Sequence, residues 1–147
     1  MLACILVANY AAQAEPQIQP ARLPLLLASG AQPVIAALDA QAAAQGARRG
    51  MPLRRARALC PDAEVRPLVE ARLRPSWDAL LEIAGEFTGR FEAQPPAGGA
   101  DPALWLDWGG AADARTMAYQ LRAALHERAK LSAEIGVAAG KFPAFAA

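Results

Sequence analysis

Cysteine and histidine are scarce in this sequence of 147 residues, which contains two cysteines, Cys4 and Cys60, and one histidine, His126. Two cysteines so far apart in the chain argue against a disulfide framework and against a zinc cluster. A lone histidine with no cysteine near it indicates a surface residue and not a metal ligand. The sequence also has no large excess of positive or negative charge, because its 15 Lys and Arg residues are nearly balanced by 14 Asp and Glu residues. The whole molecule therefore has no field that would select nucleic acid or an anionic membrane, and any binding patch must be local.

Long apolar runs are absent as well. The apolar run at residues 2–8 is too short for a membrane span and has no basic region before it, so we expect neither a signal peptide nor a membrane anchor. No other segment approaches about eighteen consecutive apolar residues. With few cysteines and no leader, the sequence predicts a protein of the reducing cytoplasm.

What is present is a series of short apolar segments separated by turn residues. Residues 2–8 predict a buried strand, and the segments LPLLLAS and QPVIAAL on either side of Gly30 predict a strand pair. Asp39 is placed to cap a short helix that Gly46 ends, and Pro52 opens a second short helix. The remaining segments predict a helix from Pro75 with an apolar stripe at Trp77, Leu80, Leu81, Ala84 and Phe87, a strand ALWLDW, a helix from Ala112 or Asp113, and a strand SAEIGVAA.

The order of these elements predicts an α+β fold. A strand, a hairpin with two short helices, and then helix, strand, helix and strand are typical of a split βαβ, or ferredoxin-like, unit that carries an insertion. In such a unit an antiparallel sheet has helices on one face. We expect one unit over residues 1–147, with the sheet formed by residues 1–20 and 75–147 and the insertion by about residues 21–74.

Three motifs resemble those of a known family. The stretch GARRGMPLRRARALCPDAEV, residues 46–65, resembles the fingers segment of Y-family translesion DNA polymerases, in which G-V-x-x-G-M-P leads into a helix ending in A-x-x-x-C-P. IGVAAGKFPAFAA, residues 135–147, resembles the palm segment V-G-I-A-x-N-K-x-x-A-K-x-A, and ALWLDW resembles the end of S-x-D-E-A-Y-L-D-V. The resemblance implies a polymerase palm with an inserted small fingers subdomain. The sequence departs from the family in that we expect no thumb and no little finger.

The resemblance also implies two magnesium ions held by carboxylates at strand ends, and those positions are altered here. The family's first acidic motif falls on Ala8 or Asn9, and the first 14 residues contain no Asp or Glu. Its second acidic motif falls on Pro102 and Ala103, with Asp101 as a possible remnant beside them. A neutral side chain supplies none of the charge that a divalent cation requires. We therefore expect no catalytic residue, no metal ion or other cofactor, and a protein that is not an enzyme.

The family's nucleotide contacts are mostly missing too. Counting back six and three residues from Gly46, where the family has Y-x-x-R, gives Ala40 and Ala43. Lys141 matches the family lysine that reaches the phosphates, and we interpret it as a vestigial phosphate contact. A solvated lysine at a helix end is the alternative interpretation.

Altered acidic positions make the sequence resemble the ImuB-type members of the family. That resemblance implies a structural or partner-binding component in translesion synthesis, DNA repair or induced (SOS) mutagenesis. Its expected partners are a separate replicative-type polymerase and the sliding clamp, with no membrane and no small-molecule substrate. A homo-oligomer is left open.

Two other functions stay open. Arginines gather in the middle of the sequence, and guanidinium groups bind phosphates without regard to base sequence, so the fingers segment could form a DNA-binding module. Its candidate DNA contacts are Arg48, Arg49, Arg54 and Arg55. The other alternative is a weak polymerase with relocated carboxylates, which would depend on Asp101.

The strand ALWLDW raises two further questions. Asp107 matches a family aspartate that is not a metal ligand, so it has no predicted catalytic role. Trp105 and Trp108 have opposite parity along the strand and are expected on opposite faces of the sheet. An exposed Trp108 would mark a partner surface, whereas a buried one belongs to the core.

Overall fold

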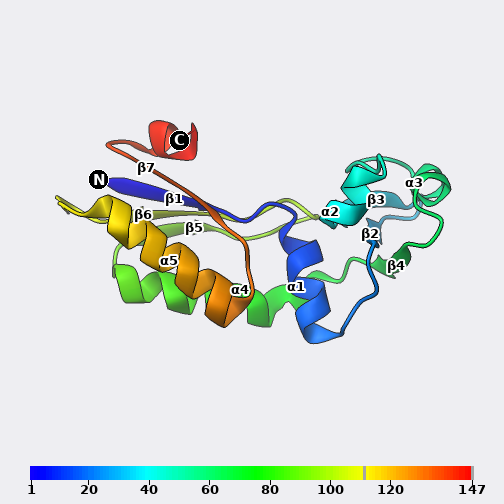
Figure 1. Ribbon diagram of the computed structural model, residues 1–147, viewed down its shortest axis with the longest axis horizontal. Coiled ribbons are helices and arrows are strands. Elements are labelled where there is room, and N and C mark those ends of the chain that lie inside the picture. The colour runs from blue at the N-terminus through cyan, green and yellow to red at the C-terminus, as the bar shows by residue number, and fades with distance from the viewer. Residues whose placement is uncertain (111, 147) are drawn as a thin grey trace. The chain divides into compact units, whose positions relative to one another are not determined.

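The computed structural model describes residues 1–110 and 112–146. Contacts within the chain divide it into two compact units, each of which mixes helices with strands (Figure 1). Unit 1 comprises Met1–Ala8, Arg74–Pro96 and Asp101–Ala147, and unit 2 comprises Asn9–Leu73 and Ala97–Ala100. In the described part of the chain, every helix is too short or too polar to cross a lipid bilayer.

Unit 1 is built on a four-stranded antiparallel sheet with the strand order β5-β6-β1-β7. Helices α4 and α5 lie on one side of this sheet and α6 lies on the other (Figure 1). The strands are β1 (Leu2–Leu6), β5 (Phe91–Gln94), β6 (Ala103–Asp107) and β7 (Glu134–Ala138). The helices are α4 (Glu70–Phe87), of which residues 70–73 belong to unit 2, α5 (Ala114–Ala129) and α6 (Lys141–Ala146).

The core of unit 1 lies between the sheet and the helices α4 and α5. Alternate strand residues point to one face of a sheet, and helix residues three or four apart share one face of a helix. The apolar face of the sheet therefore packs against the apolar faces of the helices. Full burial of one leucine or isoleucine side chain contributes about 1.5–3 kcal/mol. The side chains with no solvent exposure include Ala3, Ile5, Leu104 and Leu106 from the strands and Leu80, Leu121 and Leu125 from the helices.

Unit 2 contains a three-stranded sheet with the order β3-β2-β4. Strand β2 pairs antiparallel with β3 and parallel with β4, so the predicted strand pair around Gly30 is confirmed and gains a third strand. The strands are β2 (Leu25–Ser29), β3 (Val34–Leu38) and β4 (Glu64–Pro67), and the helices are α1 (Tyr10–Ile18), α2 (Ala40–Ala44) and α3 (Leu53–Leu59).

The predicted caps of the short helices are also confirmed. The carboxylate of Asp39 accepts hydrogen bonds from the backbone N–H groups of Gln41 at 3.2 Å and Ala42 at 3.1 Å, and so satisfies the start of α2. Gly46, which follows α2, has a φ of 99°, a conformation that glycine adopts without steric cost. Pro52 immediately precedes α3.

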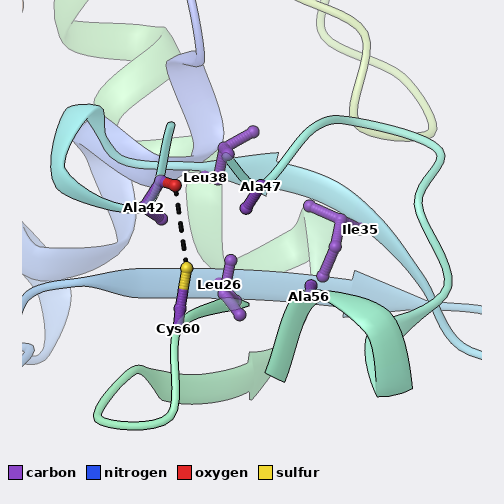
Figure 2. Packing of buried hydrophobic residues seen from close by; sticks show 7 residues of the cluster. All are labelled: Leu26, Ile35, Leu38, Ala42, Ala47, Ala56 and Cys60. Atoms are coloured by element: carbon purple, nitrogen blue, oxygen red, sulfur yellow. Dashed lines mark hydrogen bonds between the residues drawn. The ribbon is translucent and has the colours of Figure 1, made fainter. Parts of the chain in front are cut away.

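A small apolar cluster holds the helices α2 and α3 to the unit 2 sheet (Figure 2). The Cys60 thiol lies within it and donates a hydrogen bond to the Ala42 carbonyl oxygen at 3.7 Å. Burial raises the pKa of the Cys60 thiol, which keeps it protonated and unreactive at neutral pH. The cluster contains Leu26, Ile35, Leu38, Ala42, Ala47, Ala56 and Cys60.

The sequence patterns missed α1, β4 and β5, and they assigned no element to the residues of α6. Helix α1 has Pro16 inside it, and a proline in a helix interior removes one backbone hydrogen bond, so the helical signal at these residues is weak. Strands β4 and β5 have only four residues each and depend on pairing with distant strands. The helix predicted from Pro75 begins earlier, at Glu70, so Pro75 lies within α4 and not at its start.

Candidate functional site

The positions at which the resemblance places catalytic acids fall around the end of β1, at one edge of the unit 1 sheet. Leu6, the last residue of β1, pairs with Ala103 of β6 on one side and with Glu134 of β7 on the other. Because Ala8 follows β1 and Asp101 precedes β6, both lie at this edge. Ala8 is exposed, Asp101 is partly buried and Ala103 is buried.

The other two positions at which the resemblance places the acidic residues of the family are Pro102 and Asn9. Pro102 is buried and has no polar side-chain atom. Asn9 begins unit 2 with a left-handed backbone, at a φ of 51°. Its backbone carbonyl oxygen accepts hydrogen bonds from the N–H groups of Ala12 at 3.0 Å and Gln13 at 3.1 Å, so this residue starts α1.

Divalent metal ions require several oxygen ligands around one point. The carboxylates at this edge come from Asp101 and Glu134, which lie on opposite sides of β1. Two strands that flank a third are roughly 10 Å apart, so these two carboxylates come from strands that do not pair with each other. Among residues 1–110 and 112–146, no three His, Cys, Asp or Glu residues are grouped in a way that could hold a metal ion. The side chains at this edge therefore do not fit the two-metal arrangement that the resemblance implies.

Lys141, at the start of α6, lies against the sheet face opposite α4 and α5. Its ammonium group is 2.5 Å from Glu92 Oε2 on β5 and 5.4 Å from the centre of the Trp105 ring on β6. Glu92 and Trp105 are register partners, so their side chains share one face of the sheet. The lysine that the resemblance assigned to phosphate binding thus has a carboxylate and an aromatic ring as its contacts in this structure.

Trp105 lies on β6, and Trp108 directly follows the strand. Trp108 is only 7% exposed and belongs to the core, so it does not form the exposed partner surface considered from the sequence. Trp105 is partly exposed. Among the described residues, neither indole N–H has a hydrogen-bond partner.

Asp107 ends β6. One carboxylate oxygen accepts a hydrogen bond from the Gly109 N–H at 2.8 Å, and the other lies 2.9 Å from an Arg90 guanidinium nitrogen. The Thr88 hydroxyl donates to the Asp107 backbone oxygen at 2.9 Å. These contacts give Asp107 a structural role at the turn after the strand.

The candidate DNA contacts form an exposed basic segment in unit 2. Arg48 donates to the backbone oxygens of Ala43 at 2.9 Å and Ala47 at 2.7 Å, so part of its hydrogen-bonding capacity holds the end of α2. Arg54 and Arg55 lie on α3, and both are exposed. Arg57, on the same helix, and Arg49, in the preceding turn, are exposed as well.

Sequence reasoning missed a buried ionic network in unit 2. The Glu15 carboxylate on α1 is 2% exposed and lies 3.0 Å from Arg72 and 3.4 Å from Arg66. Arg66 on β4 also pairs with Glu64 at 3.0 Å. The backbone N–H of Arg22, together with Arg66, holds the pKa of Glu64 below its usual range. The signal in the sequence was a charged residue directly before Pro16 in an alanine-rich stretch, and it predicts a buried ion pair only once α1 is recognised as a packed helix.

With this geometry established, comparison with known proteins gives a family. The sequence model of the impB/mucB/samB family matches residues 5–147. The comparison with curated protein sequences found no significant match.

Solved structures of DNA polymerases have the same fold. An insertion ternary complex of Dbh DNA polymerase is similar with a TM-score of 0.83 and 20% identity, covering 99% of this chain and 44% of that one. DinB from Sulfolobus solfataricus gives a TM-score of 0.80 and 20% identity with the same coverage, and a DinB family error-prone DNA polymerase from that organism gives 0.74 and 19%. The chain spans less than half of these proteins, and it has the α+β fold of the Y-family palm region that the sequence predicted.

The comparisons overturn two expectations from the sequence. The matched structures are DNA polymerases, so the expectation that this protein is not an enzyme is wrong, because the family points the other way. The expectation of no cofactor is wrong for the same reason, since Y-family polymerases use divalent metal ions. Both expectations depended on aligning short motifs at strand ends. A shift of one residue there moves every side chain to the other face of the sheet.

Proposed function

The chain belongs to the impB/mucB/samB family, and on that premise we propose that it acts on DNA in translesion synthesis and DNA repair. In this proposal, about residues 21–74 form the fingers and bind the phosphate backbone of the template through exposed arginines. A separate polymerase and the sliding clamp complete the complex, as the resemblance to ImuB-type proteins implies.

The observation that carries the proposal is the charge of the segment between Asp39 and Asp62. It contains five arginines and no carboxylate. All five arginines are exposed, and those of α3 make no ion pair with another described residue. Unit 2 as a whole has eight arginines against five carboxylates, whereas unit 1 has nine carboxylates against seven basic residues.

Exposed arginines on a short rigid helix suit backbone binding. Guanidinium groups pair with phosphate oxygens and release condensed counterions, which gives affinity without base specificity. An enzyme or accessory protein that works on damaged templates needs such sequence-independent contacts. The Arg48 guanidinium donates hydrogen bonds to the backbone oxygens of Ala43 and Ala47, which tie the turn that precedes α3 to the end of α2.

The test is DNA binding by the double variant R54Q/R55Q. Fluorescence anisotropy with a labelled primer–template duplex that has a single-stranded template end measures the dissociation constant. Each lost phosphate contact removes an electrostatic contribution, so we expect the affinity at about 0.1 M salt to fall about tenfold or more.

The matched control is R115Q/R122Q, which removes two exposed helix arginines from unit 1. We expect this control to bind DNA as the unaltered chain does. Equal DNA affinity of R54Q/R55Q and the unaltered chain would contradict the proposal, and so would an equal loss in the control.

A further inference from the structure

Helix α5 carries a stripe of basic and aromatic side chains on its exposed side. Arg115, Tyr119, Arg122 and His126 follow one another at i, i+4, i+7 and i+11, the spacing that places residues on one helix face. All four are exposed, and Tyr119, at 61%, is the most exposed large hydrophobic residue among those described. The core residues Leu121 and Leu125 lie on the other face of the helix.

The stripe forms one wall of a groove within unit 1. Two adjoining hollows, of about 630 Å³ and 410 Å³, both have Tyr119 and Arg122 in their lining and so form one continuous depression. The first also includes His126 and the segment 131–133 before β7, and the second includes Arg115 and residues 135–137 of β7. The stripe from Arg115 to His126 is roughly 16 Å long, which matches about five residues of an extended peptide.

The charge of the groove selects its ligand. Arg115 and Arg122 make no ion pair with any other described residue, and Glu127 supplies the carboxylate in the lining. The floor is apolar, with Leu131, Ile135 and others. Tyrosine and arginine beside an apolar floor are the residues that most often dominate binding energy in protein interfaces.

A nucleic acid fits this surface less well than a peptide does. Unit 1 has an excess of carboxylates, with nine against seven basic residues, and that field repels a long polyanion. A short acidic segment interacts mainly with the local arginines, because salt screens charges beyond about 10 Å. Apolar side chains of such a segment can also pack on Tyr119 and the floor, which a phosphate backbone cannot do.

We propose that the α5 groove binds a short acidic peptide segment of a partner protein, with Arg115 and Arg122 pairing with its carboxylates and Tyr119 packing on an apolar side chain. This inference rests on the proposed function only in giving the chain a protein partner. Its surface lies in unit 1 and shares no residue with the arginines proposed to contact DNA.

The test uses a fluorescein-labelled octapeptide that alternates aspartate with leucine, and a matched octapeptide that alternates lysine with leucine. Fluorescence anisotropy of the 147-residue chain should show saturable binding of the acidic peptide and none of the basic one. R115Q/R122Q and Y119A should each weaken the acidic peptide at least tenfold, while R54Q/R55Q should bind it as the unaltered chain does. Thermal unfolding followed by circular dichroism checks that each variant is folded.

Absence of saturable binding, or equal loss in R54Q/R55Q, would overturn the inference. A loss of primer–template binding in R115Q/R122Q would also overturn it, because the groove would then serve nucleic acid. Failure of the DNA proposal is seen separately, as unchanged DNA affinity in R54Q/R55Q.

Discussion

Replacement of Glu15 by glutamine tests the buried ionic network of unit 2. Glu15 is 2% exposed and pairs with Arg72 at 3.0 Å and Arg66 at 3.4 Å, so the E15Q variant leaves two guanidinium groups without this carboxylate. Breaking a buried ion pair by removing one partner costs about 3–5 kcal/mol. Arg66 keeps Glu64 and the backbone oxygens of Gln19 and Pro20, at 2.8 and 2.7 Å, which reduces the loss. Arg72 is 35% exposed and regains some hydration. We therefore expect a loss of about 2–4 kcal/mol.

Urea unfolding followed by circular dichroism measures this loss as a lower midpoint with an unchanged slope. The control is D78N, which breaks the exposed pair between Arg74 and Asp78 at 2.9 Å. Exposed pairs of this kind contribute less than about 1 kcal/mol. A loss in E15Q no larger than that in D78N would refute the reasoning, because Glu15 would then not act as a buried counter-charge.

Two other predictions concern stability. Gly99 has a φ of 83°, and a Cβ atom there would come within 2.9 Å of the Ala36 carbonyl oxygen. G99A should therefore lower the free energy of unfolding by about 1–3 kcal/mol. In the control G110A no atom lies within 4 Å of the new Cβ, so the free energy of unfolding should change little. A thermal melt that ranks the two equally would contradict this. The Glu86 carboxylate accepts two hydrogen bonds from Arg128 at 2.7 Å, which holds the pKa of Glu86 below its usual value. The contribution of this pair to stability is therefore present above pH 4.5 and decreases as the pH falls through the lowered pKa. When the unfolding midpoint is measured as a function of pH, it should fall less steeply in acid for E86Q than for the unaltered chain.

Local sequence signals predicted the fold well where the capping residues or the apolar stripe of an element lie within the element or next to it. The caps at Asp39 and Pro52 and the stripe around Trp77 are local, and the structure confirms them. Helix α1 and strand β4 depend on distant partners. The Tyr10 hydroxyl donates to the Leu73 carbonyl oxygen at 3.1 Å, and β4 pairs in parallel with β2. No periodicity within nine or four residues could reveal those contacts.

The candidate site was harder to predict than the fold. The sequence aligned Lys141 with a phosphate-binding lysine, but β5, whose Glu92 pairs with it, was not predicted. Motif spacing also led to a wrong conclusion about enzyme and cofactor, because it considered only residues at two strand ends. The arginines on either side of Pro52 are exposed, and their role as DNA contacts stays a prediction.

The salt dependence of DNA binding tests the proposed function most directly. The logarithm of the binding constant should fall linearly with the logarithm of salt concentration, with a slope of about −0.9 for each duplex phosphate contacted and about −0.7 for each single-strand phosphate. We predict a clear negative slope for the unaltered chain and a slope smaller by about 1.4–1.8 for R54Q/R55Q. The same slope in both proteins would contradict the proposal that the arginines of α3 bind the DNA backbone.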